Sequence, residues 1–195
     1  MPVTYKNKGN KIYYLHHEKT KTGKPRYYFS MKDEGNLMEK IPEGYEIYEH
    51  PLNAQVFLRK KQSQVITDIE NHLINKYLKE LKSSYRYISD IKGKVITIFE
   101  SRQNRDNLKE ILKMLPFREH RSDSYLNERL EHETSYGPIL RFILEDEKQR
   151  IFIAERFCFK GSVDDWIFIG GPDSLENLLQ SFLKHLGQDS FYDLY

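Results

Sequence analysis

Cysteine is almost absent from this sequence of 195 residues, which contains only Cys158. A single thiol cannot form an internal disulfide, so a small fold held together by disulfides is excluded. Cys158 lies within an apolar run. We therefore expect a buried structural thiol and not a reactive one.

Long apolar runs and familiar catalytic motifs are also missing. No apolar stretch approaches the roughly 18 residues of a membrane span, and MPVTYKNKGNK at the start lacks the apolar segment of a signal peptide. We expect no membrane association and a cytoplasmic location. The patterns G-x-S-x-G, C-x-x-C and H-E-x-x-H do not occur, and Gly170-Gly171-Pro172 lacks the spacing and lysine of a P-loop. The sequence thus predicts no catalytic residue, no metal and no cofactor.

The strongest fold signal lies between Pro138 and Leu186. Three strand-like runs occur there, each rich in apolar residues and separated by short charged linkers: Ile139–Leu144, Ile151–Phe159 and Trp166–Ile169. This pattern is typical of an antiparallel meander, and strands apolar on both faces should be largely covered. An amphipathic helix is predicted over Asp173–Leu186, with Gly187 placed to end it and the aromatic tail docked on the body.

The first part of the chain carries shorter strand signals. Four runs bounded by turn residues predict two hairpins: Lys11–His17 with Arg26–Met31, and Tyr45–His50 with Ala54–Arg59. The first ten residues are polar and without periodicity, so we expect them to be mobile.

The middle of the chain alternates between helical and strand patterns. Apolar residues recur every fourth position over Ser63–Leu81, which predicts a helix. A hairpin is predicted from Tyr85–Ser89 and Val95–Phe99, followed by a short helix over Asn104–Leu115. The stretch Phe117–Tyr136 fits either a helix or a surface loop.

Charge is unevenly distributed along the chain. Residues 1–62 contain 12 Lys and Arg against 7 Asp and Glu, whereas the remainder contains 19 against 22. This asymmetry favours separate units with different surfaces. We predict an α+β fold with a small basic antiparallel module (1–62), a connecting helix (63–82) and an α+β domain (83–195), in which a β-meander packs against helices including the C-terminal one.

The first hairpin holds the best functional lead. Its candidate site residues are basic side chains at one turn and tyrosines in the adjoining strands: Lys19, Lys21, Lys24, Arg26, Tyr14 and Tyr28. Cations can neutralise phosphates, bases can stack on rings, and a two-stranded ribbon can enter a major groove. The alternative is a solvated turn whose tyrosines pack a small sheet.

Two other groups of residues contain side chains that could form a site. His16, His17 and His50 do not predict zinc, because adjacent strand residues point to opposite faces and no cysteine is near. Glu155 interrupts an apolar strand, and a buried carboxylate needs a partner such as Arg141 or Arg156.

A pocket is the third possibility. Its candidate lining is a set of carboxylates with the only tryptophan: Glu155, Asp164, Asp165 and Trp166. The alternative is a loop whose aspartates bind turn amides while the tryptophan packs in the core.

Segments GKPRYYFS, IPEGYEIYE, VFLRK and GSVDDW resemble a group of uncharacterised bacterial proteins. The resemblance implies a bacterial cytosolic origin and supplies no activity that could be transferred to this chain. The leading hypothesis is a non-enzymatic binding protein that recognises nucleic acid through the basic hairpin. The alternatives are a protein-interaction or assembly factor and a carboxylate-dependent hydrolase or nuclease.

Overall fold

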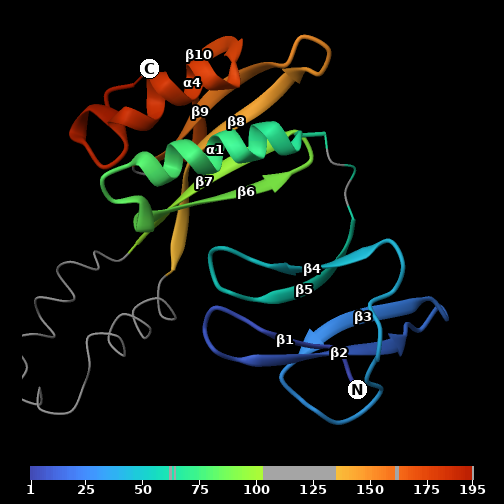
Figure 1. Cartoon of the computed structure of the whole chain (residues 1–195). Helices are drawn as coiled ribbons and strands as arrows, with labels where there is room; N and C mark the ends of the chain where they lie inside the picture. Colours follow the sequence, from blue (N-terminus) through green and yellow to red (C-terminus); the bar gives the residue numbers. More distant parts are fainter. Residues whose placement is uncertain (62, 64, 103–134, 161–162, 195) are drawn as a thin grey trace, which may run out of the picture. The chain divides into compact units, whose positions relative to one another are not determined.

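The computed structural model describes residues 1–194 except 62, 64, 103–134 and 161–162, as traced in Figure 1. Its described residues form antiparallel sheets and helices, so the predicted α+β class is confirmed. They divide into two compact units. The first contains Met1–Lys61 with the described ends of Arg102–Tyr136, and the second contains Gln62–Ser101 and Gly137–Tyr195.

The described residues of the first unit form two small antiparallel sheets. One has the order β1-β2-β3 and the other pairs β4 with β5. The strands are β1 (Thr4–Lys6), β2 (Ile12–Lys19), β3 (Pro25–Ser30), β4 (Tyr45–Glu49) and β5 (Val56–Lys60). Both predicted hairpins are confirmed. The expected mobility of the first ten residues was wrong for β1, because its backbone pairs with β2 from Ile12 to Tyr14.

Polar side chains connect the parts of this unit. The Asn7 amide is 5% exposed, donates to the Ala54 carbonyl (2.7 Å) and accepts from the Lys11 backbone N–H (2.9 Å). The Glu49 carboxylate accepts hydrogen bonds from the Tyr5 hydroxyl and the Lys8 backbone N–H, both at 3.1 Å. Buried hydrogen bonds of this kind hold β1 and its turn against the β4–β5 hairpin.

A five-stranded antiparallel sheet of order β10-β9-β8-β7-β6 organises the second unit. The strands are β6 (Tyr87–Lys92), β7 (Val95–Ser101), β8 (Tyr136–Asp146), β9 (Ile151–Lys160) and β10 (Val163–Ser174). The predicted hairpin and meander are confirmed. The linker expected over residues 160–165 was too long, because β10 begins at Val163 and includes Asp164 and Asp165.

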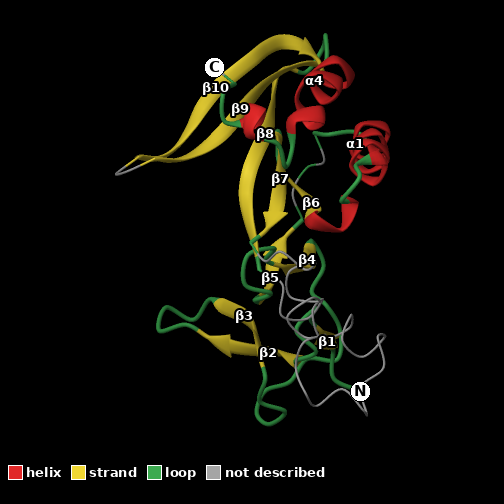
Figure 2. Cartoon of the chain, turned by 90° about the vertical axis from the view of Figure 1, so that its left-hand side faces the viewer, coloured by secondary structure: helices red, strands yellow, loops and turns green. Residues whose placement is uncertain are grey.

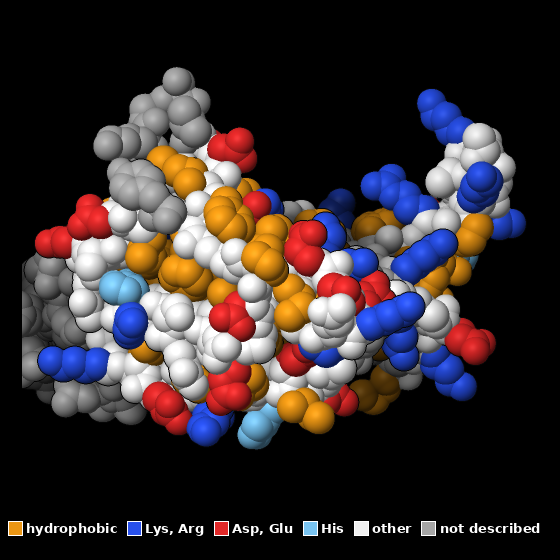
Figure 3. All heavy atoms as spheres, turned by 90° about the horizontal axis from the view of Figure 1, so that it is seen from above, with side chains coloured by type: hydrophobic (Ala, Val, Ile, Leu, Met, Phe, Trp, Pro, Cys, Tyr) orange, Lys and Arg blue, Asp and Glu red, His pale blue; other side chains and the backbone are white. Residues whose placement is uncertain are grey.

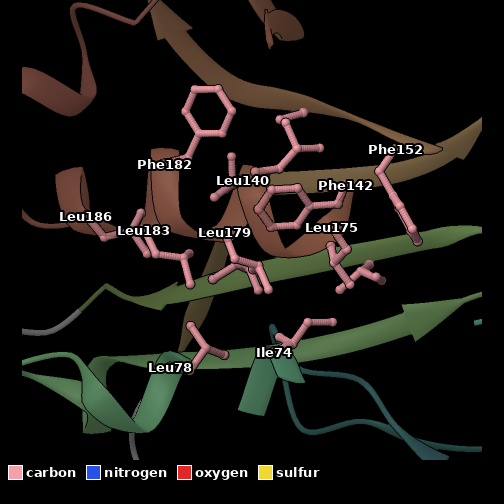
Figure 4. Close-up of a cluster of buried hydrophobic side chains, with 14 of the residues drawn as sticks. Ile74, Leu78, Leu140, Phe142, Phe152, Leu175, Leu179, Phe182, Leu183 and Leu186 are labelled. Atoms are coloured by element: carbon pink, nitrogen blue, oxygen red, sulfur yellow. The ribbon is translucent and has the colours of Figure 1, made fainter. Parts of the chain in front are cut away.

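Both long helices lie on one side of this sheet, as Figure 2 shows for α1 (Asp68–Glu80) and α4 (Leu175–Phe182). The core lies between them and the strands, where side chains such as Phe142 of β8 and Leu179 of α4 are fully buried (Figure 4). On the opposite face, Ile143 and Ile153 pair and are only half-buried. The expectation that these apolar strands are largely covered therefore holds, although Ile143 and Ile153 are less completely covered than the side chains beneath the helices.

The start of α1 is set by a capping box. The Thr67 hydroxyl accepts from the Glu70 N–H (3.3 Å), and the Glu70 carboxylate accepts from the Thr67 N–H (2.8 Å). Arg150, in the β8–β9 turn, donates to the same carboxylate (2.9 Å). The helix begins five residues later than the predicted Ser63, because the cap places its first turn at Asp68.

The C-terminal segment packs into the core. Ser174 caps α4 by accepting from the Asn177 N–H (3.3 Å), and a 3-10 turn continues the helix through His185. Gly187 follows with φ of +75°, as expected of a residue that ends a helix. Phe191 is 4% exposed and belongs to the core, which confirms the docked tail.

Two further predictions can be placed. Cys158 is buried and free, as expected. The predicted helix over Asn104–Leu115 lies outside the described residues, as does the stretch from Phe117 apart from its last residues, Ser135 and Tyr136.

Candidate nucleic-acid interface

The turn between β2 and β3 is ordered by its own hydrogen bonds. Thr20 N–H donates to the Lys24 carbonyl (2.8 Å), and Lys24 N–H donates to the Thr20 hydroxyl (3.1 Å). Gly23 N–H donates to the Thr20 carbonyl (2.8 Å) with φ of +79°, a conformation that favours glycine. The turn therefore holds the neighbouring cations on a defined backbone.

The four predicted cations are all exposed. Lys19, Lys21, Lys24 and Arg26 form no ion pair with any described residue. Figure 3 shows blue Lys and Arg side chains gathered on the arm at the right of the view, which is the β2–β3 hairpin. Over residues 18–26 the only acid is Glu18, against these four cations. The hairpin tip is thus a concentrated positive surface.

Tyr28 is engaged within the hairpin. Its ring stacks on His16, with centroids 5.2 Å apart and planes 10° apart, and its hydroxyl donates to the Glu18 carboxylate (2.6 Å). The guanidinium carbon of Arg26 lies 5.6 Å from the ring centroid. The hydrogen bond to Glu18 raises the pKa of the Tyr28 hydroxyl, with smaller contributions from partial burial and the Glu18 charge. The Tyr28 ring therefore already contacts His16, and its hydroxyl is already bound to Glu18.

The strand register shows which predicted residues share a face. Tyr14 lies opposite Ser30, His16 opposite Tyr28 and Glu18 opposite Arg26, so these six occupy one face. Lys19 lies on the other face, opposite Pro25, and Lys21 and Lys24 belong to the turn. The predicted residues lie on one hairpin but not on one face. Glu18 and His16 are neighbours of the site that the sequence reading did not include, although their alternation with Tyr14 is visible in the sequence.

The histidines of this unit have structural contacts. His16 is 4% exposed, with Nε2 2.9 Å from the Lys32 carbonyl oxygen. His17 packs on Tyr27, and His50 Nδ1 accepts from the Leu52 N–H (3.3 Å). Within the described ranges, no group of three His, Cys, Asp or Glu side chains is arranged to hold a metal ion.

In the second unit, Glu155 forms an ion pair with Arg141, one of the two partners suggested by the sequence. The Arg141 guanidinium carbon lies 4.3 Å from the Trp166 ring centroid, and Phe157 meets Trp166 edge-on at 5.0 Å. Cross-strand pairing places Phe168 beside Glu155, and its side chain is 51% exposed. Phe157 and Phe168 were not among the predicted site residues.

The carboxylates of the predicted pocket do not converge. Asp165 pairs with Cys158, on the face opposite Glu155. Asp164 shares the face of Glu155 but lies opposite Phe159, four residues and about 13 Å further along the strand. The structure brings together Glu155 and Trp166, and separates both aspartates from Glu155.

No helix among the described residues combines the length and apolar character that crossing a membrane requires. Comparisons with known protein families, with curated proteins and with solved structures found no match.

Proposed function

We propose that this protein is a non-enzymatic nucleic-acid-binding protein that contacts phosphates through the β2–β3 hairpin. The observation that carries the proposal is a set of exposed cations on a hydrogen-bonded turn that form no ion pair with the described residues: Lys19, Lys21, Lys24 and Arg26. A cytoplasmic location, where nucleic acid is accessible, belongs to the same proposal.

Phosphate neutralisation gives this proposal a measurable form. Each phosphate that a lysine or arginine neutralises releases a condensed counterion, so affinity falls as salt rises. Four contacts correspond to a slope of log K against log salt of about −3.6 for duplex DNA and about −2.8 for a single strand. Contacts of this kind are independent of sequence and strongest at low salt.

The test is a salt titration of the variant Lys21→Gln/Lys24→Gln, followed by fluorescence anisotropy of labelled DNA and RNA. The magnitude of the slope of log K against log salt should decrease by about 2, and affinity at 50 mM salt should fall on the order of a hundredfold. The matched control is Lys76→Gln/Lys82→Gln, which removes two exposed lysines of the second unit. Equal slopes for both variants, or no binding at low salt by the unaltered protein, would contradict the proposal.

A second candidate function is self-association through β10. This strand of 12 residues is an edge of the five-stranded sheet and exposes Phe168. Pairing with the same strand of a second copy would be symmetric and antiparallel. The Asp165 carboxylate accepts the Trp166 N–H (2.7 Å), which blocks one edge position and places this candidate second.

Light scattering across a concentration series tests self-association. A dimer that Phe168→Lys converts to a monomer supports it, and a monomer at all concentrations removes it. This geometry gives the hydrolase or nuclease alternative no support, because Arg141 pairs with Glu155 and both Asp164 and Asp165 lie apart from Glu155.

A further inference from the structure

We infer that the nucleic acid is B-form duplex DNA, whose major groove receives the tip of the β2–β3 hairpin. This inference rests on the proposed function and names the substrate class of the same site. Three features of the hairpin carry it: the engagement of its rings, the dimensions of its free end and the placement of its cations.

The aromatic rings nearest the tip are engaged within the protein. Tyr28 is stacked on His16, with its hydroxyl bound to Glu18. Tyr27 meets Tyr45 edge-on, with centroids 5.4 Å apart. Binding to single strands depends on rings that are free for successive bases. Since Tyr27 and Tyr28, the rings nearest the cations, already have ring partners, these two rings are less suited to stacking on successive bases.

The free end of the hairpin is long enough to enter a groove of a nucleic-acid duplex. Residues 36–38 lie along the outer edge of β2: His17 N–H donates to the Asn36 carbonyl (3.0 Å) and Met38 N–H to the Leu15 carbonyl (2.9 Å). Beyond His17, β2 pairs only with β3 among the described residues. The free ribbon from Glu18 to the turn is therefore about 13 Å long at 3.3 Å per residue.

The dimensions of nucleic-acid grooves determine which of them can admit a two-stranded ribbon. The major groove of B-form DNA is about 12 Å wide and about 8.5 Å deep and admits a two-stranded ribbon, whereas the minor groove is about 6 Å wide. The major groove of an A-form RNA helix is deep and too narrow for side chains to read. A two-stranded ribbon therefore fits the major groove of duplex DNA better than that of duplex RNA.

The cations of the tip are directed to different sides of the ribbon. Arg26 lies on one face and Lys19 on the other, while Lys21 and Lys24 lie at the turn. A ribbon in the groove would thus have a cation for the phosphates of each wall. Residues 18–26 contain no Asn or Gln, the side chains that recognise adenine, and in this arrangement their cations serve the phosphates. Binding should consequently depend on phosphate contacts and vary little with sequence.

The experiment compares three probes of one sequence and length: a duplex DNA of 20 base pairs, the corresponding duplex RNA and one DNA strand. Anisotropy at 50 mM salt should give the tightest binding to duplex DNA, by about fivefold or more over both other probes. Methyl green, which occupies the major groove, should compete, and netropsin, which occupies the minor groove, should not. Lys21→Gln/Lys24→Gln should weaken duplex DNA binding, with its fold checked by circular dichroism.

The outcomes separate the two proposals. Tighter binding of the single strand or of duplex RNA, with a loss in the lysine variant, overturns the duplex DNA inference and leaves nucleic-acid binding standing. Competition by netropsin but not by methyl green would likewise overturn the major-groove inference and leave nucleic-acid binding standing. Absence of binding to all three probes overturns both proposals. So does binding only to vesicles of phosphatidylglycerol and phosphatidylcholine, since the cations would then serve an anionic lipid surface.

Discussion

The two units of this protein are stabilised in different ways. The second unit has one cluster of buried apolar side chains from α1, α4, the strands and the tail. Among the described residues of the first unit, the buried hydrophobic side chains are few: Leu15, Ala54, Val56 and Tyr136. There, buried polar groups such as Asn7 and His16 join separate segments. The second unit depends on apolar burial and the first on hydrogen bonds.

This difference bears on function. The end of the β2–β3 hairpin is exposed among the described residues, and the cations of the first unit occupy that end. In the second unit, side chains on the helix-covered face of the sheet pack in the apolar core. In the proposed function the β2–β3 hairpin is the recognition element, and the five-stranded sheet holds the larger apolar core. Four substitutions test this comparison.

The largest expected effect is that of Phe142→Ala in the core of the second unit. The side chain is fully buried beneath the helices, so its truncation should lower the free energy of unfolding by about 3–5 kcal/mol. Urea unfolding followed by the fluorescence of Trp166, the only tryptophan, measures the loss. The control is Ile143→Ala on the half-buried face, which should lose less. Equal losses would show that the helix-covered face is not the main core.

The next effect concerns Asn7 in the first unit. Asn7→Ala removes both hydrogen bonds of a buried amide and leaves the Ala54 carbonyl without that donor, which should lower the free energy of unfolding by about 1–3 kcal/mol. Far-UV circular dichroism during urea unfolding measures it. The matched control is Asn53→Ala, an exposed residue that accepts only the Gln55 N–H and should change stability by less than about 0.5 kcal/mol. A loss no larger than this control would contradict the role of buried polar contacts in the first unit.

A smaller effect should appear at Glu70 and depend on pH. Burial alone would raise the pKa of its carboxyl group, but hydrogen bonds from Arg150 and Thr67 outweigh burial and lower it. A folded pKa below the unfolded value stabilises the protein above the ordinary pKa, about 4.3, and this stabilisation is lost as pH falls through the folded value. Glu70→Gln should therefore be less stable by about 1–2 kcal/mol at pH 7, with a smaller difference near pH 3.

Urea midpoints at the two pH values check this expectation. Glu147→Gln serves as the control, because Glu147 forms an exposed ion pair with Lys94, with about half of each side chain accessible (53% and 49%). Such a pair contributes about 0–1 kcal/mol. A difference for Glu70→Gln that does not change with pH would rule out the proposed charge dependence.

The smallest effect should come from Glu18, the one acid among the hairpin cations. Glu18→Gln removes a negative charge and should tighten binding to duplex DNA severalfold at 50 mM salt, because its repulsion of phosphates is lost. A salt titration by anisotropy measures the change. Glu43→Gln, an exposed acid of the first unit outside the hairpin, is the control. Weaker binding by Glu18→Gln would mean that the Tyr28 contact matters more than the charge.

Periodicity predicted most of the fold. The alternation over Ile151–Phe159 and the four-residue spacing from Val65 to Leu81 are local features, and the strand and helix that they predict are present. The predicted helix boundaries were less accurate, although the TDIE capping box at Thr67 marks the start of α1 in the sequence. β1 could not be predicted, because Thr4–Lys6 has no pattern of its own and is ordered by pairing with β2.

The candidate site was predictable only in part. The clustering of Lys19, Lys21, Lys24 and Arg26 follows from their proximity in sequence across one turn. A role for Tyr28 as a stacking surface was also predicted from the tyrosine-rich composition of the hairpin. Its contacts with His16 and Glu18, however, depend on the register between β2 and β3. A shift of one residue would place different side chains opposite each other, and the sequence does not specify that register.

The sequence by itself determined the local elements and the positive charge of the first hairpin, because both depend on residues that are neighbours in the chain. Only the tertiary structure decided which sheet face the helices cover, that Arg141 pairs with Glu155, and that Asp164 and Asp165 lie in a strand apart from it. These features depend on pairing between strands, which fixes the face on which each side chain lies.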